Sequence, residues 1–360
     1  MFKKPSVNKS VNSLNKLKLY IRAISKFGKS TLFRDMVLEE YGGNPEKGLL
    51  VGVGNEYGYA LLDNLNVSHI ESWNDAIELK KYLIAGKVRG EHEIELIAFD
   101  TLDELIPLCE QYVCELSEKR TGKPCDTING ALGGFGKGAE KVKELIKEYV
   151  TSLSKAGFGL VFIAHTKVKT IVEKGMNSDE GYMQLTSNLT NAYENSISAV
   201  FDVICTGVID KKVDDGKLEG TERRLYFRGD GFVEAGGRFK SNSVPEYIVF
   251  KEDEKANAKL FVETLKEAIK GSKSTPITDE EFEKLAKKED EEAKENAKEV
   301  LVEEERKERP SKEELLVQVK DIIKKDGSKK GALLKKVKGL GKKSLIELTE
   351  DELVDIVETL

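Results

Sequence analysis

The segment "LKLYIRAISKFGKSTLF" (residues 17–33) decides the fold, because it joins a strand-like apolar run to a helix-like run through a short turn. The turn, "AISKFGKS", matches the phosphate-binding pattern G-x-x-x-x-G-K-[ST] except that Ala23 stands where the pattern has glycine. Amide N–H groups at a helix N-terminus point at a bound phosphate, and the helix dipole adds positive potential. This context predicts a nucleotide site; the alternative is an unrelated turn between a strand and a helix.

Each residue type in this loop has a chemical reason to be there. Gly28 allows close approach of the backbone, the Lys29 ammonium reaches the β- and γ-phosphates, and the Ser30 hydroxyl binds Mg²⁺. Ala23 fits the end of the strand provided that its φ is negative. ATP and Mg²⁺ are therefore the expected cofactors, and the expected nucleotide contacts are Ser25, Lys26, Phe27, Gly28, Lys29, Ser30 and Thr31.

Apolar runs recur along the first three quarters of the chain and alternate with helical patterns. We expect buried strands at 17–23, 48–54, 94–100, 159–165 and 201–208. Near-continuous apolar strands separated by helices are typical of a parallel sheet that is covered on both faces. A "DDG" turn within 207–229 predicts a β-hairpin after the last of them. The fold class is therefore α/β, with a mainly parallel sheet flanked by helices.

Three further residues stand at the end of an expected strand or just past it and are candidates for chemistry. Asp100 ends the strand in "IELIAFDTLDEL" and is expected to hold Mg²⁺, while Asp103 is interpreted as a charge at a helix start. Glu56 follows the second strand and is either a water-activating carboxylate or a surface loop residue. His165 ends the fourth expected strand and is either a sensor of the γ-phosphate or a structural histidine. Ligands of open α/β sheets bind at these strand ends.

The composition divides the chain into unequal parts. Charged residues make up 34% of the 360 residues, above the usual ~25%, and they concentrate in 271–311. We expect a flexible arm at 1–16, a core at 17–270, a solvated helical linker at 271–311 and a small helical domain at 312–360. No stretch has the ~18 apolar residues of a membrane span, and the arm lacks the apolar region of a secretion signal.

The last domain contains "LLKKVKGLGKKSLIEL", which fits the spacing of a helix-hairpin-helix around Gly339, Leu340 and Gly341. Such a hairpin can present backbone N–H groups to a DNA phosphate. Because the net charge is −6, DNA can bind only where positive charge is concentrated. The alternative is an interaction domain with a solvated lysine face. The candidate DNA contacts here are Lys335, Lys336, Lys338, Lys342 and Lys343.

With these pieces placed, the chain resembles the phage-encoded ATPases of the RecA/KaiC-like P-loop superfamily, the group that includes phage single-strand annealing recombinases. The resemblance covers roughly 15–270 and lies in "SKFGKST" (25–31), "NEYGYAL" (55–61), "AFDTLDEL" (98–105), "GFGKG" (134–138), "GFGLVFIAHTK" (157–167) and "RLYFRGDGFVEAGGRF" (224–239).

The resemblance implies several properties of the site and its partners. Arg238 and Lys240 would act on the ATP of a neighbouring subunit, or else form a surface pair. Loops at 120–138 and 166–191 would face single-stranded DNA through Arg120, Lys137, Lys167 and Lys169. A homo-oligomer, as a ring or filament, is expected in the cytoplasm of a bacterial host. A single-strand-binding or replication protein is a further expected partner, and a membrane is not.

The sequence thus predicts an ATP-hydrolysing protein of RecA-like fold that acts on single-stranded DNA in phage recombination or replication. One alternative is a ring-forming DNA motor of the helicase kind. Another is a nucleotide-gated protein that binds DNA or a partner with little hydrolysis.

Overall fold

The structure is a computed structural model that describes residues 13–172, 181–214, 217–273, 278–308 and 312–359. The chain divides into two compact units, one up to Val300 and one from Leu301 onward. The first unit carries the phosphate loop, and the second is a small helical bundle.

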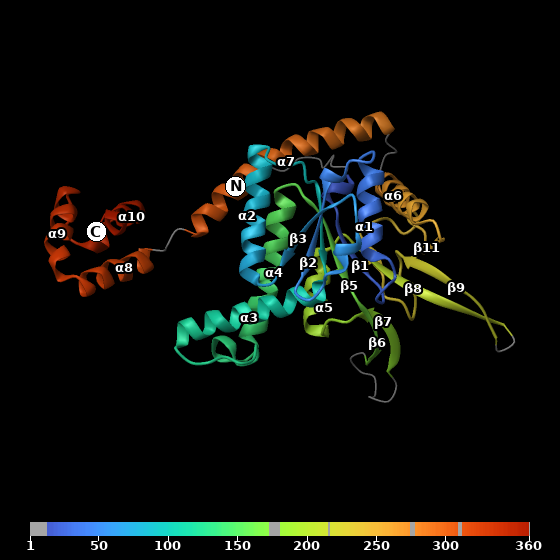
Figure 1. Cartoon of the computed structure of the whole chain (residues 1–360), viewed down its shortest axis with the longest axis horizontal. Helices are drawn as coiled ribbons and strands as arrows, with labels where there is room; N and C mark the ends of the chain where they lie inside the picture. The colour runs from blue at the N-terminus through green and yellow to red at the C-terminus, as the bar shows by residue number, and fades with distance from the viewer. Residues whose placement is uncertain (1–12, 173–180, 215–216, 274–277, 309–311, 360) are drawn as a thin grey trace. The chain divides into compact units, whose positions relative to one another are not determined.

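A mixed sheet forms the centre of the first unit (Figure 1). Six neighbouring strands are parallel, in the spatial order β3 (Asn66–Ile70), β2 (Gly48–Val53), β4 (Leu96–Asp100), β5 (Gly159–Ala164), β1 (Lys18–Arg22) and β8 (Val203–Asp214). Three strands are antiparallel to their partners, namely β9 (Lys217–Tyr226), β10 (Gly236–Gly237) and β11 (Tyr247–Phe250). All five expected strands and the expected hairpin arms are confirmed; residues 215–216 of its turn lie outside the described residues.

Helices cover both faces of the sheet. On one face lie α1 (Lys29–Glu40) and α6 (Glu254–Gly271), which pack against each other. On the other lie α2 (Trp73–Arg89), α3 (Leu102–Thr121), α4 (Lys137–Lys155) and the short α5 (Asn191–Ile197). Single-turn 3₁₀ helices occupy Leu14–Lys16, Pro45–Lys47, Gly58–Leu61, Ala131–Gly133 and Ser198–Val200.

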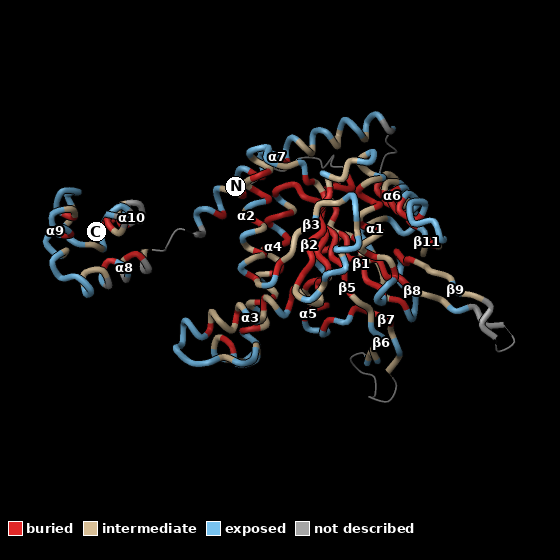
Figure 2. The backbone as a smooth tube through the Cα atoms, viewed as in Figure 1, coloured by how far each residue is buried: buried red, intermediate tan, exposed pale blue. Residues whose placement is uncertain are grey.

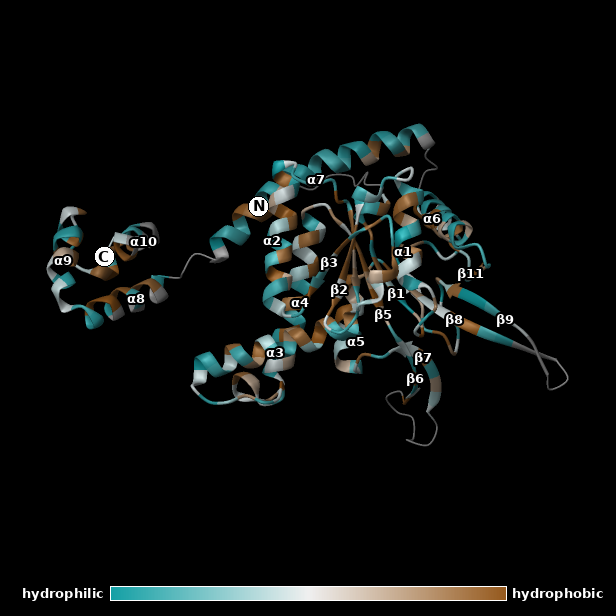
Figure 3. Cartoon of the chain, in the orientation of Figure 1, coloured by the Kyte–Doolittle hydropathy of each residue, from teal (hydrophilic) through white to brown (hydrophobic). Residues whose placement is uncertain are grey.

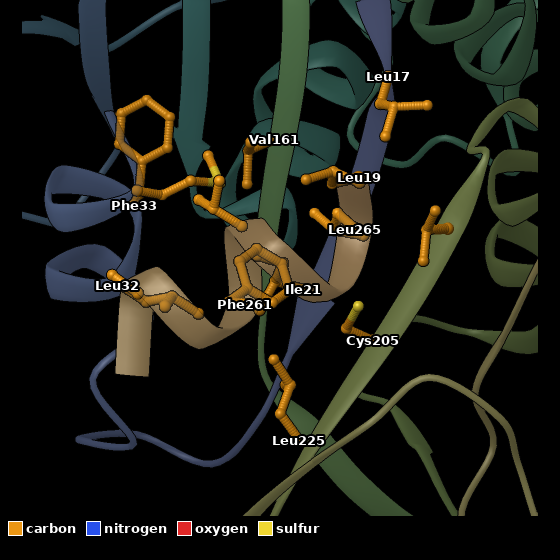
Figure 4. Close-up of a cluster of buried hydrophobic side chains, with 14 of the residues drawn as sticks. Leu17, Leu19, Ile21, Leu32, Phe33, Val161, Cys205, Leu225, Phe261 and Leu265 are labelled. Atoms are coloured by element: carbon orange, nitrogen blue, oxygen red, sulfur yellow. The ribbon is translucent and has the colours of Figure 1, made fainter. Parts of the chain in front are cut away.

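Strand β1 shows how one strand serves both faces, because successive side chains point to opposite sides. Leu19 and Ile21 join the apolar cluster beneath α1 and α6 (Figure 4). Tyr20 points the other way and stacks on Phe201, with ring centroids 4.9 Å apart. The central strands are buried along their length, as Figure 2 shows in red. The sheet thus holds the phosphate loop on a rigid support.

Residues 166–191 were expected to be an open loop, and that expectation is wrong for the two stretches 166–171 and 182–187. Strand β6 (Thr166–Ile171) pairs antiparallel with β7 (Tyr182–Ser187) in a separate two-stranded sheet, here called the β6–β7 hairpin. Its alternating Thr, Lys and Val residues form a half-exposed strand, which an analysis directed at apolar runs overlooks. Residues 173–180, between the strands, lie outside the described residues.

Two expected boundaries also differ from the structure. Leu14 is buried rather than part of a flexible arm, whose residues 1–12 lie outside the described residues. The charged segment forms α7 (Asp279–Glu308), but it is not solvated on every side. Asp290 forms an ion pair with Lys16 at 2.9 Å, and Ala293, Ala297 and Val300 are buried. Figure 3 shows α7 as a mainly hydrophilic helix, and these buried residues give it a narrow apolar side.

The second unit contains α8 (Lys312–Lys325), a 3₁₀ turn (Gly327–Lys329), α9 (Lys330–Gly339) and α10 (Glu350–Thr359). Their apolar sides enclose a small core that includes Val319, Leu333 and Ile356. Gly341 has φ +72° just past the end of α9. The residues that follow form only a 3₁₀ turn (Leu345–Glu347), so the second helix of the expected hairpin does not begin directly after the glycines.

Candidate active site

The phosphate loop connects the C-terminal end of β1 to the first turn of α1. Gly28 has φ +99°, a left-handed conformation that glycine adopts without strain, and Lys26 is also left-handed at φ +62°. Ala23 is not among the residues with positive φ, so the condition for its replacement of glycine is met. Ser25 and Lys26 are exposed, whereas Phe27 packs its ring into the core against Phe250.

Lys29 lies inside the loop rather than above it. Its Nζ donates hydrogen bonds to the carbonyl oxygens of Ala23 and Ile24, each at 3.1 Å. Burial lowers the pKa of Lys29, and Asp100, Asp103 and Glu56 oppose that shift in this order. The ammonium is therefore held among carbonyls and carboxylates, where a bound polyphosphate would find it desolvated and pre-positioned.

Ser30 and Asp100 meet at the same edge of the sheet. The Ser30 Oγ, in the first turn of α1, donates to Asp100 Oδ2 at the end of β4 at 2.6 Å, although β5 separates β1 from β4 in the sheet. Burial raises the pKa of Asp100, while the Ser30 hydrogen bond and the Lys29 charge lower it. A hydroxyl beside a buried carboxylate is the hard oxygen pair that Mg²⁺ prefers.

Glu56 is half-buried in the turn after β2, and this turn packs closely over Gly52 of the strand. A Cβ on Gly52 would lie 2.3 Å from the Tyr59 ring and 2.7 Å from the Glu56 carbonyl oxygen, so only glycine fits. Burial first, and the Asp100 charge second, raise the pKa of the Glu56 carboxyl. A carboxyl with a raised pKa is better suited to accept a proton near neutral pH.

His165 and Asp103 form a pair that sequence reasoning missed. Asp103 stands in the first turn of α3, as a helix-start charge would, but its Oδ2 accepts the backbone N–H of His165 at 2.7 Å. The same oxygen is 3.2 Å from His165 Nδ1. The D-x-x-D spacing of Asp100 and Asp103 at a strand–helix junction was the available signal. Asp103 thus fixes the position of His165 beside Asp100.

The residues present fit ATP and Mg²⁺. Within the described residues, no group of three or more His, Cys, Asp or Glu side chains could hold a metal alone. Mg²⁺ usually takes one or two protein ligands and completes its shell with phosphate oxygens and water. Thr101 Oγ1 and Asp103 Oδ1 are buried without a hydrogen-bond partner in the described part of the chain. Water at the metal would supply such partners.

The two basic residues expected to act between subunits lie far from the phosphate loop, toward the opposite ends of the strands. Arg238 follows β10 and forms an ion pair with Asp202 at 3.1 Å, so it lies at the N-terminal end of β8. The phosphate loop follows the C-terminal end of β1, which runs parallel to β8. Lys240 donates to the Lys273 carbonyl at 2.7 Å. Neither side chain can reach this chain's own phosphate loop.

A different arginine touches the phosphate loop within the same chain. Arg223 of β9 donates from Nη1 to the Phe27 carbonyl at 3.3 Å, and the same atom lies 3.6 Å from where a Gly28 Cβ would be. Its Nη2 donates to the Lys251 carbonyl at 2.8 Å. The sequence stretch "ERRLYF" gave no sign of this contact, because the hairpin register decides which arginine faces the loop.

The candidate DNA contacts lie on separate surfaces. Arg120 is exposed at the end of α3, Lys137 is exposed at the start of α4, and Lys167 is exposed on β6. Lys169 differs, since its Nζ donates to the Leu189 carbonyl and lies 3.3 Å from Asn191 Oδ1. Its ammonium is therefore engaged by residues that follow the hairpin.

The lysines of the second unit lie on and after α9. Lys335, Lys338 and Lys343 are exposed, and Lys336 and Lys342 are half-buried. The Lys336 ammonium donates to the Thr359 hydroxyl, which ties α9 to α10. Three of these five lysines are thus presented to solvent.

Comparison with known proteins identifies the first unit. A family model described as "AAA domain" matches residues 15–239, more than half of the chain. A search of curated proteins finds no match. Among solved structures, a KaiC-like protein from the hyperthermophilic archaeon Pyrococcus horikoshii OT3 matches with 11% identity and a TM-score of 0.34, over 67% of this chain and 87% of that one. A TM-score of this size says nothing about function. No helix among the described residues has the length and apolar character to cross a membrane.

Proposed function

Since the chain belongs to the AAA domain family of P-loop ATPases, we propose that it hydrolyses ATP in response to single-stranded DNA, in phage recombination or replication. The observation that carries the proposal is the contact between Ser30 and Asp100 at 2.6 Å, beside a buried Lys29. That contact joins the helix of the phosphate loop to the acidic end of a second strand, as nucleoside triphosphate hydrolysis requires.

The geometry of the loop supports ATP binding. Its amide N–H groups and the Lys29 ammonium would bind the β- and γ-phosphates as Lys29 leaves the carbonyls of Ala23 and Ile24. Mg²⁺, held by Ser30 and Asp100, would supply charge neutralisation at the phosphate oxygens. The protein's own contribution is to hold these groups in place before the substrate arrives.

Glu56 would orient the attacking water and accept its proton. Its raised pKa follows from burial and from the nearby Asp100 carboxylate, and both features suit a base in a partly dry site. His165, held by Asp103, would sense the γ-phosphate. The β6–β7 hairpin begins at the next residue, and Asn188 after β7 donates its N–H to the His165 carbonyl at 2.8 Å.

Single-stranded DNA would bind at the hairpin and at the loop before α4. Lys167 is exposed on β6, and Arg120 and Lys137 flank the second loop. Between those two lies Phe135, whose side chain is 100% exposed. Lysine and arginine bind phosphates, and an exposed aromatic ring offers a surface on which a base can stack.

We propose a homo-oligomer, as a ring or filament, on the strength of Arg238. Its side chain is 64% exposed and lies at the edge opposite the phosphate loop, so it could serve only a neighbouring subunit's ATP. An arginine from a neighbour can stabilise the charge on a transferring phosphoryl group. Because α9 carries exposed lysines, the second unit is a candidate binding surface for DNA or for a single-strand-binding protein.

The test is an ATPase assay titrated with single-stranded oligonucleotide, with Lys29→Ala as the inactive control. The proposal predicts turnover that rises with DNA in the wild type and is absent in the variant. ATP binding without measurable turnover would instead indicate the nucleotide-gated binding protein. ATP-dependent separation of a labelled duplex would indicate the motor.

A further inference from the structure

Arg22 is the largest fully buried side chain of the described residues, and the hydrolysis mechanism does not use it. It ends β1, directly before Ala23, and its side chain has 0% exposure. It points to the Tyr20 side of the sheet, away from α1 and α6. A buried charge is costly unless it is paired and hydrogen-bonded, so the contacts of this guanidinium should explain its presence.

The guanidinium makes five hydrogen bonds, as many as it has N–H donors. Nε donates to Thr206 Oγ1 at 3.0 Å; Nη1 donates to Glu194 Oε1 at 2.8 Å and to Thr186 Oγ1 at 3.4 Å. Nη2 donates to the Glu234 carbonyl at 2.6 Å and to its Oε2 at 2.8 Å. These partners come from β8, α5, β7 and the turn before β10, and each lies more than 160 residues beyond Arg22 in the sequence.

A second layer of hydrogen bonds connects these partners to the hairpin. Glu194 Oε2 accepts from the Ser187 hydroxyl at 2.5 Å and from the Tyr20 hydroxyl at 3.1 Å. The Thr186 hydroxyl donates to Glu234 Oε2. Thr186 and Ser187 are the last two residues of β7, so both anchor the base of the β6–β7 hairpin to one guanidinium.

The backbone beside Arg22 belongs to the phosphate loop. The Ala23 carbonyl accepts from Lys29 Nζ at 3.1 Å and from the Thr166 N–H at 3.3 Å, and Thr166 is the first residue of β6. If Lys29 turned to a bound phosphate, as the proposed function requires, the Ala23 carbonyl would lose that donor. Arg22 is therefore linked to both parts of the molecule. The backbone of the next residue, Ala23, contacts Lys29 of the phosphate loop, and the Arg22 side chain binds Thr186 of β7.

We propose that Arg22 is a positioning residue that fixes the β6–β7 hairpin relative to the phosphate loop, so that ATP binding changes the hairpin's affinity for single-stranded DNA. This inference rests on the proposed function, because it assumes that the hairpin binds DNA. Lysine could not replace this arginine, since an ammonium has three donors and lacks the planar fork that reaches Glu194 and Glu234 together. By linkage, DNA on the hairpin would tighten ATP binding by the same factor.

The experiment measures the dissociation constant of a fluorescent single-stranded oligonucleotide by anisotropy, with and without Mg²⁺ and ATPγS. The variants are Arg22→Lys and Thr186→Val, and the second leaves the buried charge pair of Arg22 and Glu194 in place. Arg89→Met is the matched control, because Arg89 is exposed on α2. We expect the wild type and the control to show an ATPγS effect of at least ~5-fold, and both variants to lose most of it.

Hydrogen exchange of the peptide 182–190 separates failure of this inference from failure of the proposed function. ATPγS should slow exchange there in the wild type and not in the folded variants, whether or not DNA binds. A wild type that does not bind DNA refutes the proposed function, yet an ATPγS response lost in the variants still supports the role of Arg22. Circular dichroism and ATPγS affinity establish whether each variant is folded. If Arg22→Lys does not fold, the result for Thr186→Val decides the test. A wild-type hairpin indifferent to ATPγS, or variants with an unchanged response, would overturn the inference.

Discussion

Asp100→Asn should abolish hydrolysis and leave stability almost unchanged, a combination that a structural aspartate would not give. The amide oxygen of the substituted side chain could still accept the Ser30 hydrogen bond that Asp100 Oδ2 now accepts at 2.6 Å. The change exchanges a charge-assisted bond for a neutral one, at a cost of about 1 kcal/mol, and also removes a buried charge. The two effects oppose each other, so we expect the unfolding free energy to change by no more than about 1 kcal/mol, or roughly 3 °C in Tm.

The pH dependence of the unfolding free energy tests whether burial raises the pKa of Asp100. Because burial raises the pKa of Asp100, the folded state holds that proton more tightly than the unfolded state does. This contribution to stability is complete below the ordinary carboxyl pKa and is lost as pH rises through the raised value. Between those two pKa values the wild type should therefore lose stability with rising pH more steeply than Asp100→Asn, whose side chain does not ionise. Thermal denaturation across that range, without nucleotide, measures the difference.

The assay for function is phosphate release with Mg²⁺, with and without single-stranded DNA. We expect at least a ~10²-fold loss of turnover in Asp100→Asn, since the carboxylate stabilises charge in the site. Turnover within about threefold of wild type would place the metal elsewhere. A loss of several kcal/mol in stability would make Asp100 a structural residue and refute this reasoning as well.

Four further predictions test the rest of the site. Lys29→Ala should lose hydrolysis and weaken ATP binding strongly, as measured by titration with a fluorescent ATP analogue; wild-type turnover would exclude the phosphate-loop role. Glu56→Gln should keep ATP binding and slow hydrolysis by ~10²–10⁴-fold. In the wild type, kcat should fall as pH drops through the raised pKa of Glu56, because the base must be ionised, and a pH profile without that limb would argue against it. Arg238→Ala should lower turnover but not ATP affinity, and mixing it with Lys29→Ala should restore some activity; no recovery in mixtures would remove the neighbouring-subunit role. A chain that ends at residue 310 should keep ATP-stimulated DNA binding with a smaller salt dependence, at ~0.7 per lost phosphate contact, and anisotropy without any ATP effect would assign DNA binding to the second unit.

The parallel sheet was predictable because its strands are apolar on both faces and end in recognisable residues. Asp100, Glu56 and His165 could be located by their position after such strands, since strand ends share one edge. The edge strand β3 was missed because "NVSHI" is mostly polar and only its last residue is buried, so it is not an apolar run. The β6–β7 hairpin was missed for the same reason.

Other features could not be predicted because they depend on tertiary contacts. Arg22 lies inside a run that looks apolar, and its partners stand at 186, 194, 206 and 234. Arg223 reaches the phosphate loop only through the register of β9 on β8. The buried apolar residues of α7, Ala293, Ala297 and Val300, are few and lie three or four apart within a charged helix, too weak a pattern to outweigh the composition.

The central claim is that one site, built from Lys29, Ser30, Asp100 and Glu56, hydrolyses ATP under the control of single-stranded DNA. Steady-state ATP turnover as a function of oligonucleotide concentration, for the wild type and Glu56→Gln side by side, tests it most directly. The predicted result is a saturable rise in the wild type and, in the variant, DNA binding that persists with ATP while turnover stays at background. Turnover that is indifferent to DNA, or equal in the two proteins, would contradict the claim.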